Sequence, residues 1–242
     1  MLNFPHSDAP QKRGALAIFC RAPRLGTVKT RIAQTRGEEF ALGLYRAMLA
    51  DTFALSRALA PKIETFACFT PKDGFEGDNP FAELWDGPHL AQCEGDLGAR
   101  ILDCFAQLRA RGFEKIVVIG SDSPDLPLKR LQRAFEKLEH LPALLAPSPD
   151  GGFYLIGASE NGREELLQNV RWSSSNTRID ITNNLKTYDP KLRRQIGSKF
   201  PLPAWRDVDD EDDLMELRRR IFELGTHAPH TRDFLANNRT GS

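Results

Sequence analysis

Short apolar runs alternate along this chain with longer segments in which apolar residues recur every three or four positions. The short runs predict buried strands, and the longer segments predict amphipathic helices that cover them. We expect strands at 15–20, 63–70, 89–93, 116–119, 144–146 and 153–156. We expect helices at 38–60, 97–108, 128–138, 179–185 and 214–224. This alternation predicts an α/β fold with one mainly parallel sheet and helices on both faces.

The run at 116–119 is the most continuous of the predicted strands. It is apolar and β-branched throughout and stops at Gly120, with Asp122 two residues later and Pro124 and Pro127 beyond it. Ligands bind at the carboxyl ends of strands in open α/β sheets, so Asp122 stands where a ligand is expected. We hypothesise that Asp122 holds a divalent metal on a nucleotide diphosphate. Ordinary turn chemistry is the alternative.

A cationic loop follows the first predicted strand. Arg21, Lys29 and Arg31 supply positive charge, and Gly26 lets a ligand approach the backbone closely. The loop is a candidate phosphate site. It is not a P-loop, because Val28 stands where that motif has a glycine before the lysine. A merely solvated loop is the alternative.

Two further turns carry candidate site residues. Asp96 is placed to cap a helix, whose free N–H groups would also attract an anion or a ribose. The sequence Asp150-Gly151-Gly152 predicts a tight hairpin turn, although a substrate could also lie against its bare backbone. Asp150 is the one candidate general base that we recognise near the acceptor.

An acidic run precedes the last predicted helix. It holds five aspartates and one glutamate between Asp207 and Asp213. A solvated acidic helix start is one explanation. The other is that Asp209 or Asp207 supplies a second carboxylate to the metal. The later run 218–220, all arginine, is expected to be a solvated helix face.

Composition narrows the class of protein. The chain has 242 residues, 40% of them hydrophobic and 27% charged, with a formal net charge of zero. These values are typical of a globular protein and give no general affinity for nucleic acid or for anionic membranes. No apolar stretch approaches the roughly 20 residues that span a bilayer. We expect a loose tail at 1–13 rather than a signal peptide, one domain at 14–226, and a partly helical tail at 227–242.

The cysteines point to a reducing compartment. The chain has four, none in C-x-x-C spacing, so zinc is not expected: Cys20, Cys68, Cys93 and Cys104. Three of them fall in predicted strands, where a free cysteine behaves as a small buried hydrophobe. This usage predicts a cytoplasmic protein.

Five motifs in order carry a resemblance to a known family. They are F-x-R-x-P-x-x-G-x-V-K-T-R (19–31), G-D-L-G-x-R (95–100), G-S-D-S-P (120–124), P-x-x-D-G-G-F-Y-L-I-G (147–157) and W-S (172–173). Together they resemble the bacterial DUF2064 family, which belongs to the nucleotide-diphospho-sugar transferase superfamily. They are also similar to guanylyltransferases that load phospholactate or phosphoenolpyruvate, and to molybdenum-cofactor guanylyltransferases. The likeness covers residues 14 to about 186.

The resemblance implies a three-layer α/β/α fold of the GT-A type and a set of roles. Asp122, Lys29 and Asp150 would be catalytic, and Asp122 and Asp209 would bind Mg²⁺ or Mn²⁺. Val208-Asp209 is similar to the ending of cytidylyltransferases, where the aspartate binds a second metal. The nucleotide-binding residues would be Arg21, Gly26, Lys29, Arg31, Asp96, Gly98, Ser121, Gly151 and Gly152.

Three functions are consistent with these residues. The first is metal-dependent transfer from a nucleotide-sugar donor to a small acceptor. The second is nucleotidyl transfer to a phosphorylated small molecule, because many GT-A glycosyltransferases carry Asp-x-Asp and this chain has Ser121-Asp122-Ser123. The third is a nucleotide-binding domain that has lost catalysis. The sequence leaves open the base, the sugar, the acceptor and whether the chain forms a homodimer.

Overall fold

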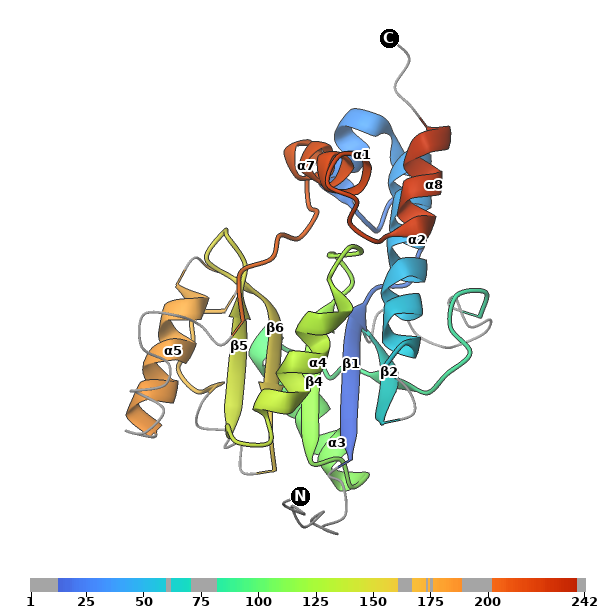
Figure 1. Ribbon diagram of the computed structural model, residues 1–242. Coiled ribbons are helices and arrows are strands. Elements are labelled where there is room, and N and C mark those ends of the chain that lie inside the picture. The colour runs from blue at the N-terminus through green and yellow to red at the C-terminus, as the bar shows by residue number, and fades with distance from the viewer. Residues whose placement is uncertain are drawn as a thin grey trace, which may run out of the picture.

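A six-stranded sheet forms the centre of the protein (Figure 1). The computed structural model describes residues 13–59, 62–70, 82–160, 167–172, 174, 176–188 and 202–238. Its strands are β1 (Gly14–Cys20), β2 (Ile63–Phe69), β3 (His89–Ala91), β4 (Lys115–Gly120), β5 (Ala143–Pro147) and β6 (Phe153–Ala158). Their order across the sheet is β3-β2-β1-β4-β6-β5. All six predicted strands are present.

The sheet is mainly parallel, as predicted. Strands β1 to β4 pair in parallel, whereas β6 is antiparallel to both β4 and β5. The exception arises at the predicted turn Asp150-Gly151-Gly152, which joins β5 to β6 as a hairpin. The carboxyl ends of β1, β2, β3 and β4 therefore open onto one edge of the sheet, where ligand sites of such folds lie.

The described residues contain seven helices. They are α1 (Thr30–Arg36), α2 (Glu38–Arg57), α3 (Leu97–Ala110), α4 (Leu128–Lys137), α5 (Thr177–Tyr188), α7 (Glu211–Phe222) and α8 (Pro229–Asn237). The five predicted helices are all found. Helix α1 was not predicted, because its seven residues follow directly on a loop and are too few to show a periodic pattern. The predicted N-terminal tail lies almost wholly outside the described residues.

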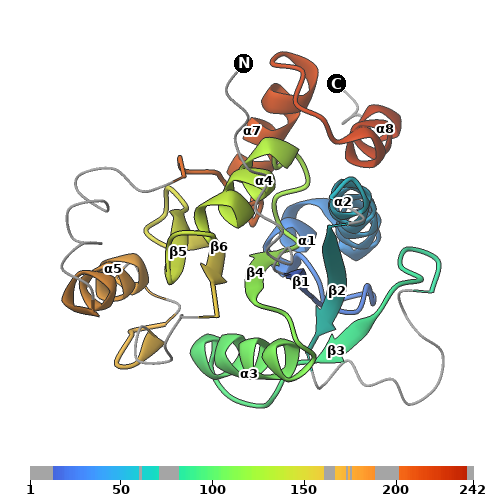
Figure 2. The ribbon, with the colours of Figure 1, turned by 60° about the horizontal axis from the view of Figure 1, so that its bottom comes forward.

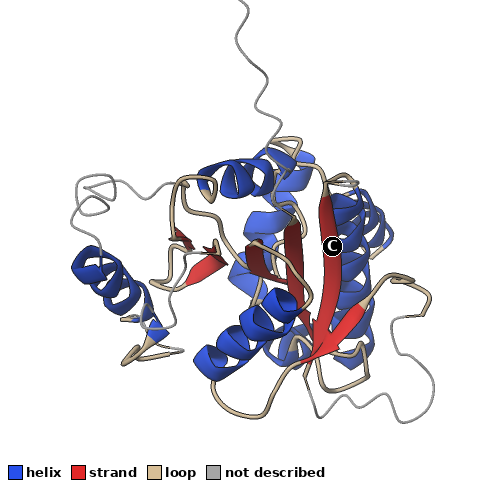
Figure 3. Cartoon of the chain, turned by 90° about the horizontal axis from the view of Figure 1, so that it is seen from below, coloured by secondary structure: helices blue, strands red, loops and turns tan. Residues whose placement is uncertain are grey.

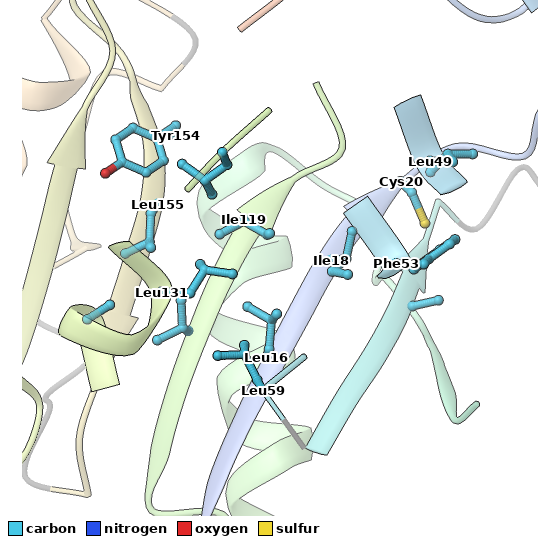
Figure 4. Close-up of a cluster of buried hydrophobic side chains, with 14 of the residues drawn as sticks. Leu16, Ile18, Cys20, Leu49, Phe53, Leu59, Ile119, Leu131, Tyr154 and Leu155 are labelled. Atoms are coloured by element: carbon cyan, nitrogen blue, oxygen red, sulfur yellow. The ribbon is translucent and has the colours of Figure 1, made fainter. Parts of the chain in front are cut away.

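Helices cover both faces of the sheet and make the predicted three layers (Figures 2 and 3). Alternate residues of β1 point to opposite faces. Leu16 and Ile18 belong to the core under α2 and α4, and Ala15 and Ala17 to the core under α3 and α5. Figure 4 shows the first of these cores. Both faces of β1 are buried, which explains why its sequence is an unbroken apolar run.

A third apolar cluster lies beyond the carboxyl edge of the sheet. Helices α1, α2, α7 and α8 enclose it, with Ile32, Leu44, Leu217 and Leu235 at its centre (Figure 1). The buried Asp51 of α2 fixes α8, because its carboxylate accepts hydrogen bonds from the backbone N–H groups of residues 230 and 231 at 3.0 and 2.8 Å. A carboxylate at a helix N-terminus satisfies otherwise unpaired N–H groups. The segment predicted as a partly helical tail thus contains a helix docked on α2.

Two further sequence expectations can be compared with the described residues. None of the four cysteines forms a disulfide, and three are buried, with Cys93 half-buried. Within the described part of the chain, no helix combines the length and apolar character that crossing a membrane requires.

A buried ion pair anchors α7 to the loop after β4. The guanidinium of Arg220 donates to both carboxylate oxygens of Asp125, at 2.7 and 3.0 Å. The Asp125 side chain is fully buried, and Arg220 is only 7% exposed. Trp205 Nε1 also donates to Asp125 at 3.3 Å. The prediction of a solvated face at 218–220 is therefore wrong for Arg220, because an aspartate distant in sequence draws it inward.

Substitution of Arg220 tests this anchor. Arg220→Ala leaves the Asp125 carboxylate buried without its partner, which should lower the free energy of unfolding by about 3–5 kcal/mol. Arg219→Ala is the matched control, because Arg219 is exposed and pairs with Glu216 at the surface of the same helix. Urea denaturation measures both variants. Equal losses in the two variants would contradict a structural role specific to Arg220.

Candidate functional site

Lys29 connects the loop after β1 to the start of α1. Its backbone adopts the left-handed conformation, with φ 46° and ψ 45°, which is uncommon for a residue other than glycine. Its side chain is only 5% exposed. A strained backbone and a buried charge together indicate a constrained position, and such positions cluster at functional sites.

The Lys29 ammonium joins three separate segments. It donates hydrogen bonds to Asp122 Oδ1, in the loop after β4, and to the carbonyl oxygen of Val208, at 2.6 Å. It also lies 3.5 Å from Asp209 Oδ1. The Val208 N–H donates to the Asp122 carbonyl at 2.9 Å and fastens the last two segments to each other. The predicted residues Lys29, Asp122 and Asp209 thus lie together.

The electrostatics of this cluster keep Lys29 charged. Burial lowers the pKa of Lys29, but the nearby carboxylates of Asp122 and Asp209 raise it by more, so the net shift is upward. An ammonium group that is out of water yet flanked by two carboxylates stays protonated at neutral pH. The cluster therefore holds one fixed positive charge between two negative ones.

Asp207 lies beside this cluster with a different environment. Ser123 Oγ donates to Asp207 Oδ1 at 2.6 Å. Burial raises the pKa of Asp207 to about 7, and the negative charges of Asp122 and Asp209 add to that rise. Of the two carboxylates considered for a second metal ligand, Asp209 is the one in contact with Lys29, and Asp207 is the one held by Ser123.

A first cavity of about 660 Å³ opens at the carboxyl ends of β1, β3 and β4. This volume suits a small-molecule ligand such as a nucleotide. Four cationic side chains face it, and so do the carboxylates of Glu94, Asp122 and Asp209. The cations are Arg21, Lys29, Arg31 and Arg100.

The floor of the first cavity is fixed by Tyr45. Its hydroxyl oxygen accepts from the Arg21 N–H at 2.8 Å and donates to the Arg21 carbonyl at 3.2 Å. The same hydroxyl lies 3.2 Å from Ser121 Oγ. Burial raises the pKa of Tyr45 well above its ordinary value, so the hydroxyl keeps its proton. The tyrosine holds the loops after β1 and β4 against each other.

A second cavity of about 530 Å³ adjoins the first on the side of β4 and β6. Apolar side chains line much of it, together with Asp150, Gly152 and Asp207. Four residues line both cavities: Phe19, Arg31, Leu97 and Asp209. The two cavities therefore meet next to the cluster of Lys29, Asp122 and Asp209.

The predicted site residues divide into two groups. The residues that line a cavity are Arg21, Lys29, Arg31, Ser121, Asp122, Asp150, Gly152 and Asp209. The structure brings these together from four loops that are far apart in sequence. The residues that line neither cavity are Gly26, Asp96, Gly98 and Gly151.

Local structure accounts for the four residues that line neither cavity. Gly26 and Gly151 have φ of +73° and +95°, which favours glycine. Asp96 Oδ1 accepts from the Ala99 N–H at 2.8 Å and caps α3. A Cβ on Gly98 would lie 2.2 Å from the indole nitrogen of Trp172, so this glycine admits the tryptophan ring.

Several cavity residues were not predicted as site residues. Tyr45 lies within the predicted helix at 38–60, and its hydroxyl is the signal that could set it apart. Gln92, Glu94 and Arg100 surround the predicted cap of α3, and Ser174 and Thr177 precede or begin α5. Arg100 belongs to the motif at 95–100, whereas for the other four only the fold shows that they face a cavity.

The carboxylates of Asp122 and Asp209 suit a metal ion whose other ligands are oxygen atoms of the substrate. Within the described residues, no group of three or more His, Cys, Asp or Glu side chains is arranged to hold a metal ion. Asp122 and Asp209 nevertheless direct oxygens at one cation, the ammonium of Lys29. Two carboxylates, with water and phosphate oxygens, are a common ligand set for Mg²⁺ and Mn²⁺.

The raised pKa of Asp207 predicts a pH-dependent stability. The folded protein holds this proton up to about pH 7, whereas the unfolded chain releases it near 3.8. The folded state binds more protons within this window, so its stability falls as the pH rises through it. Asp207→Asn cannot ionise, so its free energy of unfolding relative to wild type should rise from about pH 4 to about pH 7 and then level off.

Urea denaturation at a series of pH values in metal-free buffer measures this effect. Asp212→Asn is the control, because Asp212 is exposed in the first turn of α7 and should show no such trend. Parallel pH curves for wild type and Asp207→Asn would refute the environment described for Asp207.

The chain is similar to known proteins in sequence and in fold. The family model for uncharacterized proteins conserved in bacteria, DUF2064, matches residues 56–174. A candidate nucleotide-diphospho-sugar transferase from Desulfovibrio desulfuricans G20 is 28% identical, with a TM-score of 0.79, over 93% of this chain and 94% of that chain. No curated protein matches the chain.

Two other solved structures align with lower scores. Rv0371c from Mycobacterium tuberculosis H37Rv is 15% identical, over 86% of this chain and 98% of that chain, with a TM-score of 0.49. A 4-diphosphocytidyl-2C-methyl-D-erythritol synthase is 11% identical over the same shares, with a TM-score of 0.48. The family model and the Desulfovibrio structure confirm the resemblance that the motifs predict, and the chain has the GT-A fold of the Desulfovibrio protein.

Proposed function

We propose that this protein is a metal-dependent transferase that moves a sugar from a nucleotide-diphospho-sugar donor to a small acceptor. One observation carries the proposal: Lys29, Asp122 and Asp209 meet where a cavity rich in cations adjoins a second cavity. The first cavity would take the donor and the second the acceptor. The fold and the Desulfovibrio relative support this class of reaction.

The first cavity is suited to the diphosphate of the donor. Arg21, Lys29, Arg31 and Arg100 face it, and charge-assisted hydrogen bonds from such groups bind phosphate oxygens strongly. A diphosphate leaves more readily when its developing negative charge is stabilised by preorganised donors. Lys29 lies where the two cavities meet, and its ammonium would turn to the diphosphate once a metal takes over its carboxylate partners.

A divalent metal completes the proposed site. Asp122 and Asp209 would hold Mg²⁺ or Mn²⁺, and their convergence on the Lys29 ammonium supports a cation between them. When bound, the ion would neutralise charge on the diphosphate. The chain's own residues would bind the substrates and accept the proton.

The proposed transfer is a single substitution. The oxygen of an acceptor hydroxyl forms a bond to the anomeric carbon of the sugar, and the bond from that carbon to the diphosphate breaks. The electron pair leaves with the nucleoside diphosphate, and the hydroxyl proton goes to the Asp150 carboxylate. Asp150 lines the second cavity, and its Oδ1 accepts from the Gly152 N–H at 3.0 Å, which orients the carboxylate.

A second candidate function is nucleotidyl transfer to a phosphorylated small molecule. The single aspartate of Ser121-Asp122-Ser123-Pro124, in place of Asp-x-Asp, favours it. The same cations would then stabilise a departing pyrophosphate. Both activities would use the first cavity. They differ in the product that is released.

Product analysis separates the two candidates. Sugar transfer releases a nucleoside diphosphate, and nucleotidyl transfer releases pyrophosphate. We expect incubation with nucleotide sugars, Mn²⁺ and a mixture of small acceptors to yield nucleoside diphosphate, measured by ion-exchange chromatography. Pyrophosphate formed from nucleoside triphosphates would instead support the second candidate. Turnover of neither class would leave a nucleotide-binding domain without catalysis.

Binding by an Asp122 variant tests the metal role. Asp122→Asn should weaken Mn²⁺-dependent binding of nucleoside diphosphates by at least about 10-fold, since changes to groups that act even indirectly on a metal have effects of that size. Isothermal titration calorimetry measures the affinity, and circular dichroism verifies that the variant is folded. Asp212→Asn, which removes an exposed carboxylate outside both cavities, should bind as wild type does. Unchanged binding by Asp122→Asn would show that the assigned role is wrong.

A further inference from the structure

We propose that the acceptor in the second cavity is an uncharged molecule that presents hydroxyl groups on one side and an apolar face on the other. This inference rests on the proposed function and narrows it. It excludes acceptors that carry a phosphate or another strong anion. The charge, the hydrogen-bonding capacity and the apolar walls of the cavity all favour such a molecule.

The charge of the second cavity is opposite to what a phosphorylated acceptor needs. Three carboxyl groups face it, from Asp150, Asp207 and Asp209, against the single guanidinium of Arg31. If a metal takes Asp209, the carboxyl groups of Asp150 and Asp207 still face the cavity. A negative ligand group next to one of them would be repelled, which weakens its binding.

Arg206, which lies next to the acidic residues of the second cavity, does not change this balance of charge. A smaller cavity of about 190 Å³ continues past Asp150 and Asp207 and is lined by Arg206 and Asp213. The Arg206 guanidinium donates to Asp213 Oδ1 at 3.1 Å, so its charge is already matched. The acidic character therefore extends beyond the second cavity instead of ending at its edge.

The uncharged polar groups of the cavity favour a ligand that donates hydrogen bonds. The hydroxyls of Ser174 and Thr177 both donate to the carbonyl of Arg171, at 2.7 Å each. Each hydroxyl has one proton, so only oxygen lone pairs remain for a ligand. The carboxylates likewise only accept when ionised. An acceptor with several hydroxyl groups supplies the missing donors, whereas an ionised phosphate supplies none.

The remaining wall of the second cavity is apolar. Leu97 and Ile101 from α3 and Phe153 and Tyr154 from β6 contribute to it. The ring of Phe153 also packs edge-on against Trp172, with centroids 6.4 Å apart, which fixes its orientation. Rigid apolar and aromatic surfaces bind the apolar face of a ligand while a few polar groups orient it.

Three small probes with one shared ring test the inference. Phenyl β-glucoside is neutral and hydroxyl-rich, phenyl phosphate is anionic, and benzylamine is cationic. Their binding to wild type, with Mn²⁺ and a nucleoside diphosphate saturating the first cavity, can be measured by saturation-transfer NMR and competition. We expect the glucoside to bind at least about 10-fold more tightly than the phosphate, from the repulsion above. Equal or tighter phosphate binding, binding of benzylamine alone, or no glucoside binding would overturn the inference.

A charge variant ties the preference to the cavity. Asp150→Asn removes one carboxylate and should narrow the ratio of the two dissociation constants several-fold, by improving phosphate binding. Asp233→Asn is the control, because Asp233 is an exposed carboxylate of α8 outside the cavities described. An unchanged ratio in Asp150→Asn would show that this carboxylate does not set the preference and would overturn the charge argument.

The same measurements distinguish a failure of the proposed function from a failure of the inference about the acceptor. Loss of Mn²⁺-dependent nucleotide binding, with the probe preference intact, would refute the proposed function and leave the character of the second cavity standing. Normal nucleotide binding with a preference for phenyl phosphate would refute the inference alone and favour the nucleotidyl-transfer candidate.

Discussion

The burial of one ammonium group among carboxylates constrains the whole carboxyl edge of the sheet. Lys29 is almost withdrawn from water, and a charge in that position must be paired. Its partners are Asp122, Asp209 and the carbonyl of Val208, which come from two other segments of the chain. These three segments cannot separate without leaving a charge unpaired, so the pairing fixes where the two cavities meet.

Two other contacts hold the loops of this junction in place. The hydroxyl of Tyr45 holds the loops after β1 and β4 together under the first cavity. The ion pair of Asp125 and Arg220 fastens α7 to the loop that carries Asp122. Each connects a site loop to a helix packed in an apolar core. Groups held in this way need little reorganisation when charge develops on a ligand, which is the property that electrostatic catalysis requires.

The sequence predicts the sheet and the longer helices because their apolar patterns are local. It predicts the cluster in part, because Lys29 and Asp122 lie in the loops after β1 and β4, which end at one edge, whereas Asp209 is assigned only through the resemblance. It does not predict the inward turn of Arg220, because the burial of that guanidinium depends on Asp125, 95 residues away. Gly98 shows the opposite case: it belongs to a recognisable motif, but the fold uses it to admit the ring of Trp172.

The central claim is that a metal held by Asp122 and Asp209 and the ammonium of Lys29 grip the same diphosphate. A crystal structure with Mn²⁺ and a nucleoside diphosphate, with the metal located by anomalous scattering, tests this most directly. The account predicts manganese bound to both carboxylates and to a phosphate oxygen, with the Lys29 ammonium turned toward the diphosphate. Manganese bound elsewhere, or a nucleotide outside the first cavity with Lys29 still paired to Asp122, would contradict it.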